Sequence, residues 1–118
     1  VKGEILGNQS DLYESLRWVG LASHKVSKMT YAISGGVTDG ASMVKALLVG
    51  ASAVEVCSAI YREGASAIRN MLSFVEEWMA ANSYERIPEF RETMNAGKIG
   101  GGAAFQRSQF YKTYGKYE

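Results

Sequence analysis

The chain has 118 residues, which is the size of one domain or of a part of one. Its 47% apolar and 21% charged residues are ordinary for a globular protein. The 13 Lys and Arg residues nearly balance the 12 Asp and Glu residues, and no basic block occurs, so the sequence disfavours a nucleic-acid binder. A single cysteine, Cys57, and a single histidine, His24, exclude an internal disulfide and a structural zinc site.

Neither a membrane span nor a signal peptide is evident in the sequence. No apolar run is long enough to cross a bilayer, and the first residues lack the charged-then-apolar pattern of a signal peptide. These features predict a soluble, cytoplasmic protein. The sequence starts at Val1 and not at Met, which is expected of the remainder of a longer polypeptide.

The first part of the chain predicts a helix followed by a strand. Apolar residues between Asn8 and Ser23 recur about every 3.6 residues, which is typical of an amphipathic helix. Asn8 or Ser10 can serve as its N-cap. Met29–Ile33 is a short apolar and β-branched run that ends near a pair of glycines, which predicts a buried strand.

A second helix and a second strand follow. Asp39 is placed to cap a helix over Ala41–Leu48, and Gly50 stops that helix. Ala53–Cys57 is a second apolar run. It is separated from the first by a connection of crossover length, which predicts parallel pairing of the two strands.

The rest of the chain predicts helices and a tail. Ser58–Glu63 predicts a short helical turn, Ala65–Ala81 the longest helix, and Pro88–Met94 one more helix with proline in its first turn. Residues 97–118 form a tail rich in glycine and aromatic residues, to which no regular structure is assigned. Two parallel strands alone leave both edges open, so the pattern predicts a piece of a larger α/β sheet or barrel.

Three single residues invite a chemical role, and each has a more ordinary explanation. Cys57 ends a predicted strand and has no histidine in a partnering position, so we expect it to pack in the core. His24 lies in a polar connection and is expected at the surface. Glu55 is a charged residue within an apolar strand, which predicts a partner or a position at the rim of a barrel interior.

The strongest functional pattern is a pair of turns. Each predicted strand runs into a tight turn of small residues that opens a helix, at Gly35-Gly36 and at Cys57-Ser58. Such turns present backbone N–H groups to an anion, and two of them on neighbouring strands form a phosphate cradle. The glycines would let the backbone approach a phosphate, and Ser58 would add a hydroxyl. Short turns also use small residues for geometry alone, and the sequence leaves both interpretations open.

Several segments resemble the C-terminal quarter of the dihydroorotate dehydrogenase family. They are Leu16–Trp18, Ile33–Gly40, Lys45–Ala51, Val54–Ile60, Glu63-Gly64 and Glu77–Met79, within residues 16–94. These motifs have moderate specificity, because other flavin barrels share the Gly-Gly turn.

The resemblance implies a (β/α)8 TIM barrel that carries FMN. Met29–Ser34 would be strand 7 of this barrel and Ala53–Cys57 would be strand 8. In this family the FMN takes a hydride from dihydroorotate to give orotate, in pyrimidine biosynthesis. The parent protein is accordingly expected to be an FMN-dependent oxidoreductase that acts on a CH–CH bond.

The resemblance also implies which residues bind the cofactor. Gly35 and Gly36 match the glycines that contact the FMN phosphate through backbone N–H groups. Cys57, Ser58 and Ala59 match the turn after strand 8. Many members have Gly-Thr where this chain has Cys57-Ser58, so a hydroxyl is kept at the second position while a side chain is added at the first.

The catalytic chemistry is expected to lie elsewhere in the parent protein. The resemblance places the catalytic base, the substrate-binding asparagines and the flavin-facing lysine before this sequence begins. Residues 1–118 are therefore expected to be the C-terminal fragment of one FMN-binding barrel domain, with no catalytic residue and no metal ligand. Expected partners are a small-molecule substrate and either the remainder of the barrel or further copies of the chain in a homo-oligomer.

Two other functions stay open. A barrel enzyme could use the same cradle to hold a phosphorylated metabolite without flavin. A free-standing chain could instead pair with itself to cover its strand edges, and could serve as a non-enzymatic binding or assembly module.

Overall fold

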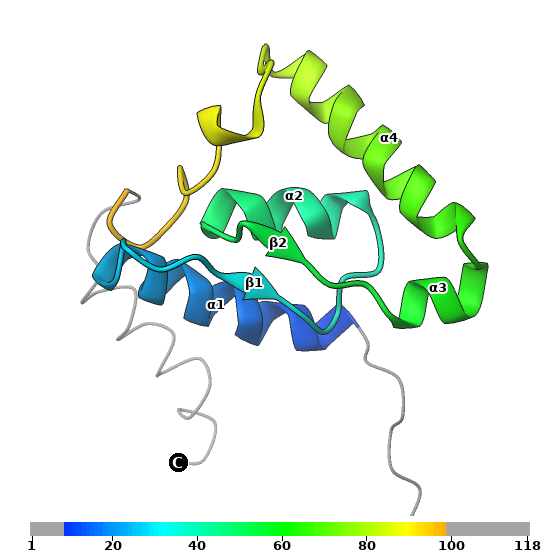
Figure 1. Cartoon of the computed structure of the whole chain (residues 1–118), viewed down its shortest axis with the longest axis horizontal. Coiled ribbons are helices and arrows are strands. Elements are labelled where there is room, and N and C mark those ends of the chain that lie inside the picture. Colours follow the sequence, from blue (N-terminus) through cyan, green and yellow to red (C-terminus); the bar gives the residue numbers. More distant parts are fainter. Residues whose placement is uncertain (1–8, 99–118) are drawn as a thin grey trace, which may run out of the picture.

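The computed structural model describes residues 9–98 as a small, mostly helical α/β domain (Figure 1). Its elements in chain order are α1 (Gln9–Lys25), β1 (Ala32–Ile33), α2 (Gly40–Val49), β2 (Ala53–Val54), α3 (Ser58–Glu63), α4 (Ser66–Ala81) and the 3-10 helix η1 (Ile87–Glu89). This order is consistent with a fragment of a barrel, although residues 9–98 themselves contain one two-stranded sheet. None of their helices is both long enough and apolar enough to cross a membrane.

The two strands pair in parallel, as predicted. Ala32 lies opposite Ala53 and Ile33 opposite Val54. Both strands are shorter than predicted, and their register explains why. If the pairing is extended toward the start of both strands, Met29 lies opposite Gly50. Gly50 is the C-cap of α2 and has a φ of 124°, so it is not in an extended conformation. Continued forwards, the pairing reaches Gly35, whose φ of 87° leaves the extended conformation, so the ladder stops at both ends.

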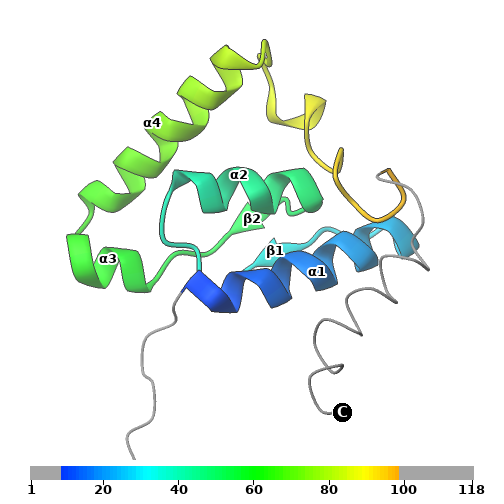
Figure 2. The same ribbon diagram turned by 180° about the vertical axis from the view of Figure 1, so that it is seen from behind.

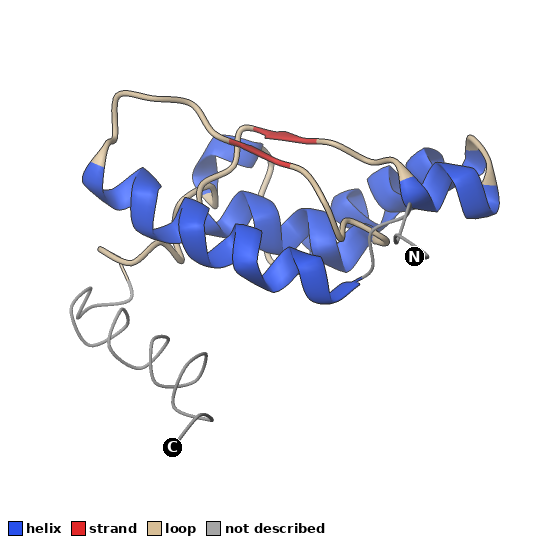
Figure 3. Cartoon of the chain, turned by 90° about the horizontal axis from the view of Figure 1, so that it is seen from below, coloured by secondary structure: helices blue, strands red, loops and turns tan. Residues whose placement is uncertain are grey.

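Helices cover one face of this sheet. Figure 3 shows the two strands at one side of the layer of helices. Along β2 and the residues after it, Val54 and Val56 are partly buried against the core, whereas Glu55 and Cys57 are exposed. The expectation that Cys57 packs in the core is therefore wrong. Side chains alternate between the two faces of a strand, and Val56 takes the position that faces the helices.

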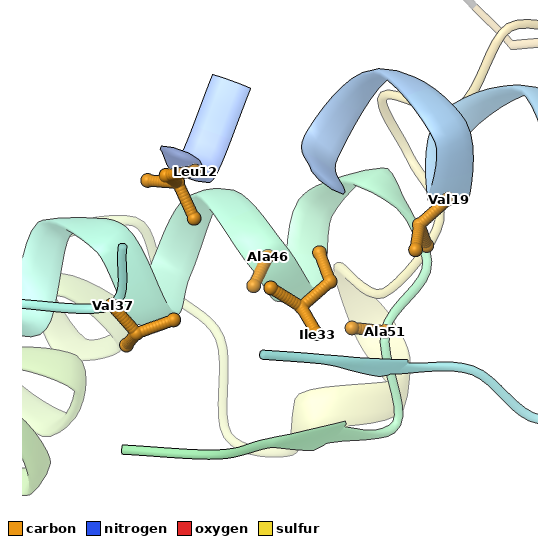
Figure 4. Close-up of a cluster of buried hydrophobic side chains, with 6 residues drawn as sticks. All are labelled: Leu12, Val19, Ile33, Val37, Ala46 and Ala51. Carbon is orange, nitrogen blue, oxygen red and sulfur yellow. The ribbon is translucent and has the colours of Figure 1, made fainter. Parts of the chain in front are cut away.

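The main hydrophobic core lies between the sheet and the helices α1 and α2 (Figure 4). Its buried residues are Leu12, Val19, Ile33, Val37, Ala46 and Ala51. A second cluster of Ala59, Ala67 and Met71 joins α3 to α4. Figure 2 shows α2 between α1 and α4, so one short helix contributes to packing on both sides.

Both predicted ends of α2 are confirmed. The Asp39 carboxylate accepts hydrogen bonds from the Ser42 N–H at 2.8 Å and from the Ser42 hydroxyl at 2.7 Å. At the other end, the N–H of Gly50 donates to the Leu47 carbonyl at 3.1 Å. For α1, Ser10 lies inside the helix and is not its cap, whereas Asn8 falls outside the described residues.

The predicted helix Pro88–Met94 is wrong. Ile87–Glu89 forms a single 3-10 turn. Some backbone N–H groups after it bond locally, whereas those of Glu92, Met94 and Ala96 bond to other helices. The N–H of Met94 donates to the Leu48 carbonyl and that of Ala96 to the Gly20 carbonyl, each at 2.9 Å. These N–H groups therefore bond to carbonyls of α2 and α1 and not to carbonyls four residues earlier, as a helix in this segment would require. Of the predicted tail 97–118, the structure describes residues 97 and 98, and the rest lies outside the described residues.

The segment after α4 is held by an aromatic cluster. The Phe90 side chain is fully buried, and its ring centroid lies 5.0 Å from that of Trp78 and 5.2 Å from that of Tyr84. Trp78 and Tyr84 also stack on each other at 5.8 Å. Because α4 supplies Trp78, these three rings fix the chain after α4 back onto that helix.

Candidate functional site

Both strand-to-helix turns leave the same end of the sheet. Figure 1 shows the two strand arrows pointing the same way, toward the first residues of α1, α2 and α3. The Glu55 N–H donates to the Ile33 carbonyl at 2.8 Å, so the two chains are still paired where they leave the strands. Gly35-Gly36 therefore follow β1 at the same end of the sheet at which Val56-Cys57 follow β2. Both predicted turns lie at this end, after neighbouring strands.

The first turn depends on glycine for its backbone conformation. Gly35 has φ 87° and Gly36 has φ 75°, a region that side chains strongly disfavour. Gly36 is buried, whereas Gly35 is exposed. A Cβ added at Gly35 would meet nothing nearer than the Cβ of Asp11, at 4.0 Å. Gly35 is therefore exposed with Asp11 beside it, and the conformation alone already accounts for both glycines.

The amides of this turn are available for an additional acceptor. Within residues 9–98, no hydrogen-bond acceptor is found for the backbone N–H of Gly35 or of Gly36. The Ser34 carbonyl next to them accepts a hydrogen bond from the Ser15 hydroxyl at 3.3 Å. Successive backbone N–H groups in such turns can bind an anion.

The second turn presents a different surface from the one expected. Cys57 precedes α3 and is exposed, whereas Ser58 is 6% exposed and Ala59 2% exposed. Ala59 packs in the cluster shared with α4. The first amides of a helix have no partner within that helix, so the α3 end adds donors. The exposed side chain at this turn is therefore the Cys57 thiol, and the Ser58 hydroxyl is largely covered.

Two carboxylates limit how strongly an anion can bind here. Asp39 already occupies the amino end of α2 through its bonds to Ser42, so that helix end is neutralised by its own chain. Asp11 stands beside Gly35 in the first turn of α1. The donors that this end of the sheet could offer to an anion are thus mainly the Gly35-Gly36 amides and those at the start of α3.

Two other predicted positions can be placed. Glu55 and His24 are exposed, the latter in the last turn of α1, which confirms the expectation of a surface histidine. His24 lies so close to Gly97 that a Cβ there would overlap the imidazole ring. Among residues 9–98, no three side chains of His, Cys, Asp or Glu gather in a way that could hold a metal ion.

The structure adds a pocket that sequence reasoning missed. It has a volume of about 420 Å³ and lies between α1 and β1. Its lining residues are Asp11, Glu14, Ser15, Trp18, Val19, Ala32, Ile33 and Ser34. The sequence signal was the spacing of Asp11, Ser15 and Trp18, which places them along one side of a helix.

Comparison with known proteins gives one partial similarity. No model of a protein family matches the sequence. The chain is similar to the probable dihydroorotate dehydrogenase A (fumarate) of Enterococcus faecalis (strain ATCC 700802 / V583), with 38% identity over 58 residues. The alignment covers 49% of this chain and 19% of that protein, so the chain matches about a fifth of the relative's length. The similarity agrees in part with the family resemblance of the sequence motifs.

Proposed function

We propose that the chain is the C-terminal part of an FMN-dependent oxidoreductase of the dihydroorotate dehydrogenase type. Its role in that protein is to hold the phosphate of the flavin. The Gly35-Gly36 turn and the turn at Cys57, Ser58 and Ala59 form the binding site, on neighbouring parallel strands of a (β/α)8 barrel. The partial similarity to a probable dihydroorotate dehydrogenase supports the choice of reaction class.

One observation carries the proposal. Two strand-to-helix turns leave the same end of a parallel sheet, and one of them contains two amides without an acceptor among the described residues. A phosphate group has several oxygens that accept hydrogen bonds, and backbone N–H groups at such turns are suited to it. Gly35 is exposed, and a Cβ added there would meet the Asp11 Cβ at 4.0 Å, so the backbone of this turn is accessible to such a group.

The residues fit the phosphate end of FMN. FMN, when bound, supplies the hydride acceptor for the oxidation of the substrate. The amides of Gly35 and Gly36 would donate to the phosphate, and those at the start of α3 would add further donors. The carboxylates of Asp11 and Asp39 would weaken the binding, because both carry negative charge near the phosphate.

The chemical step belongs to other parts of the proposed protein. The residues that contact the substrate and remove its proton would come from the remainder of the barrel. We therefore expect the 118-residue chain by itself to bind FMN weakly and to show no turnover of dihydroorotate. The same turns would also serve a barrel enzyme that holds a phosphorylated metabolite without flavin, and the binding experiment below separates the two.

The test compares ligands that differ only in the phosphate. FMN and riboflavin are titrated into the full chain, and binding is followed by the amide signals of Gly35 and Gly36 in nuclear magnetic resonance spectra. We expect FMN to bind with a Kd of about 1 mM, riboflavin to bind far more weakly, and inorganic phosphate to compete. Equal binding of FMN and riboflavin would contradict a phosphate site. Binding of inorganic phosphate that is no weaker than that of FMN would favour the alternative without flavin.

A further inference from the structure

One side-chain hydrogen bond joins α1 to the turn after β1. The Ser15 hydroxyl donates to the Ser34 carbonyl at 3.3 Å, across 19 positions of the sequence. A serine inside a helix often bonds to a carbonyl of its own helix. Here the hydroxyl bonds instead to the residue just before Gly35, so it acts on the backbone of the first of the two turns.

This bond fixes the direction of one peptide unit. The carbonyl of Ser34 and the N–H of Gly35 belong to the same planar, trans peptide unit, so they point in opposite directions. Ser15 holds that carbonyl toward α1. The N–H of Gly35 is therefore directed away from α1, and Gly35 is exposed.

The opposite orientation of this peptide unit would bring the amide to a carboxylate. Asp11 lies one helical turn before Ser15, on the same side of α1, and a Cβ added at Gly35 would be 4.0 Å from the Asp11 Cβ. If the peptide unit turned over, the Gly35 N–H would point toward α1 and could donate to this carboxylate. Glycine opposes such a rotation only weakly, because it adopts both positive and negative φ. A contact that selects one orientation is therefore required, and Ser15 supplies it.

The bond of Ser15 acts together with a second one from the neighbouring strand. The Ile33 carbonyl accepts a hydrogen bond from the Glu55 N–H at 2.8 Å, on the side of β2. The next carbonyl, that of Ser34, is bonded on the side of α1. Two bonds from different elements thus hold the residues that lead into the glycine pair.

We propose that Ser15 is a positioning residue for the phosphate turn. Its hydroxyl holds the peptide unit between Ser34 and Gly35 in the orientation that offers the Gly35 N–H to a phosphate oxygen and keeps this amide away from Asp11. The inference rests on the proposed function, because it names the residue that prepares one of the two turns for the phosphate.

The test compares three variants of the full chain by nuclear magnetic resonance and by titration with inorganic phosphate. Ser15→Ala removes the hydroxyl and Ser15→Thr keeps it. Ser73→Ala is the matched control, since it removes the hydroxyl of an exposed serine on α4. Alanine is the best helix former, so both alanine variants are expected to keep the circular dichroism of the original chain.

The expected result separates Ser15→Ala from the other two variants. It should shift the carbonyl carbon signal of Ser34 and weaken phosphate binding by about three- to tenfold, the loss that one hydrogen bond accounts for. Ser15→Thr and Ser73→Ala should keep both values of the original chain. An unchanged Ser34 signal, or equal phosphate affinity of Ser15→Ala and Ser73→Ala, would overturn the inference. Absence of phosphate binding to the original chain would instead refute the proposed function, and the Ser34 signal would still decide whether Ser15 orients the peptide unit.

Discussion

Gly40, the first residue of α2, lies directly against the Phe74 side chain of α4. A Cβ added at Gly40 would overlap both the Cβ and the ring of Phe74. This close approach lets α2 and α4 pack together, since any larger residue would separate the two helices. The contact links the helix after the first turn to α4, which has 16 residues and is not the longest helix as predicted, since α1 has 17.

The substitution Gly40→Ala is expected to destabilise the domain. The added methyl group overpacks the contact with Phe74, and overpacking costs about 1–3 kcal/mol in the free energy of unfolding. Gly20→Ala is the control. Its Cβ would lie 3.7 Å from the Cβ of Val49, an ordinary contact, and alanine within a helix stabilises by about 0.5–1 kcal/mol. Urea denaturation of both variants measures the difference, and an equal effect of the two would contradict the packing described.

The Asp39 carboxylate is expected to stabilise α2 as its N-cap. Asp39→Ala removes the acceptor of two hydrogen bonds from Ser42 and should cost about 1 kcal/mol in the free energy of unfolding. Asp39→Asn keeps a side-chain acceptor and should cost less. Thermal denaturation followed by circular dichroism checks this order. Equal losses in the two variants would show that the charge of Asp39, and not its hydrogen bonds, stabilises the helix.

The charge of Asp11 is expected to weaken anion binding at Gly35. Asp11→Asn removes a negative charge beside the turn and should strengthen inorganic phosphate binding by about two- to fivefold at low salt. The gain should shrink as salt is added, because exposed charges are screened. Glu76→Gln, on α4, removes a charge elsewhere and serves as the control. A phosphate affinity unchanged by Asp11→Asn would argue against binding at this turn.

The helices and the ends of α2 could be predicted because their signals are local. Asp39 and Gly50 act on backbone groups a few residues away, and the apolar period of α1 and α4 requires only a neighbouring surface. The lengths of the strands could not be predicted in this way. They depend on the register between the strands, which places Met29 opposite the end of α2.

The other differences also arise from contacts distant in sequence. The segment after Pro88 has a sequence that suits a helix, yet Met94 bonds to a carbonyl of α2. Cys57 lies in an apolar run, but only alternate residues of that run face the helices, so its thiol is exposed. The pocket beside Trp18 exists because α1 extends over the unpaired edge of β1. The pair of turns was predicted from the sequence. The burial of Ser58 was not, because it depends on how the elements pack in the fold.

The most direct test of the phosphate site is a comparison of two glycine variants. Gly35→Ala and Gly64→Ala both place a side chain at a positive φ, of 87° and 77°, and both added Cβ atoms meet open space or an ordinary contact. Each should cost about 1–2 kcal/mol in stability, but only Gly35 borders the proposed site. We predict that inorganic phosphate shifts the amide signals of Gly35 and Gly36 in the original chain, and that Gly35→Ala abolishes its binding while Gly64→Ala retains it. Equal phosphate affinity in the two variants would contradict the site.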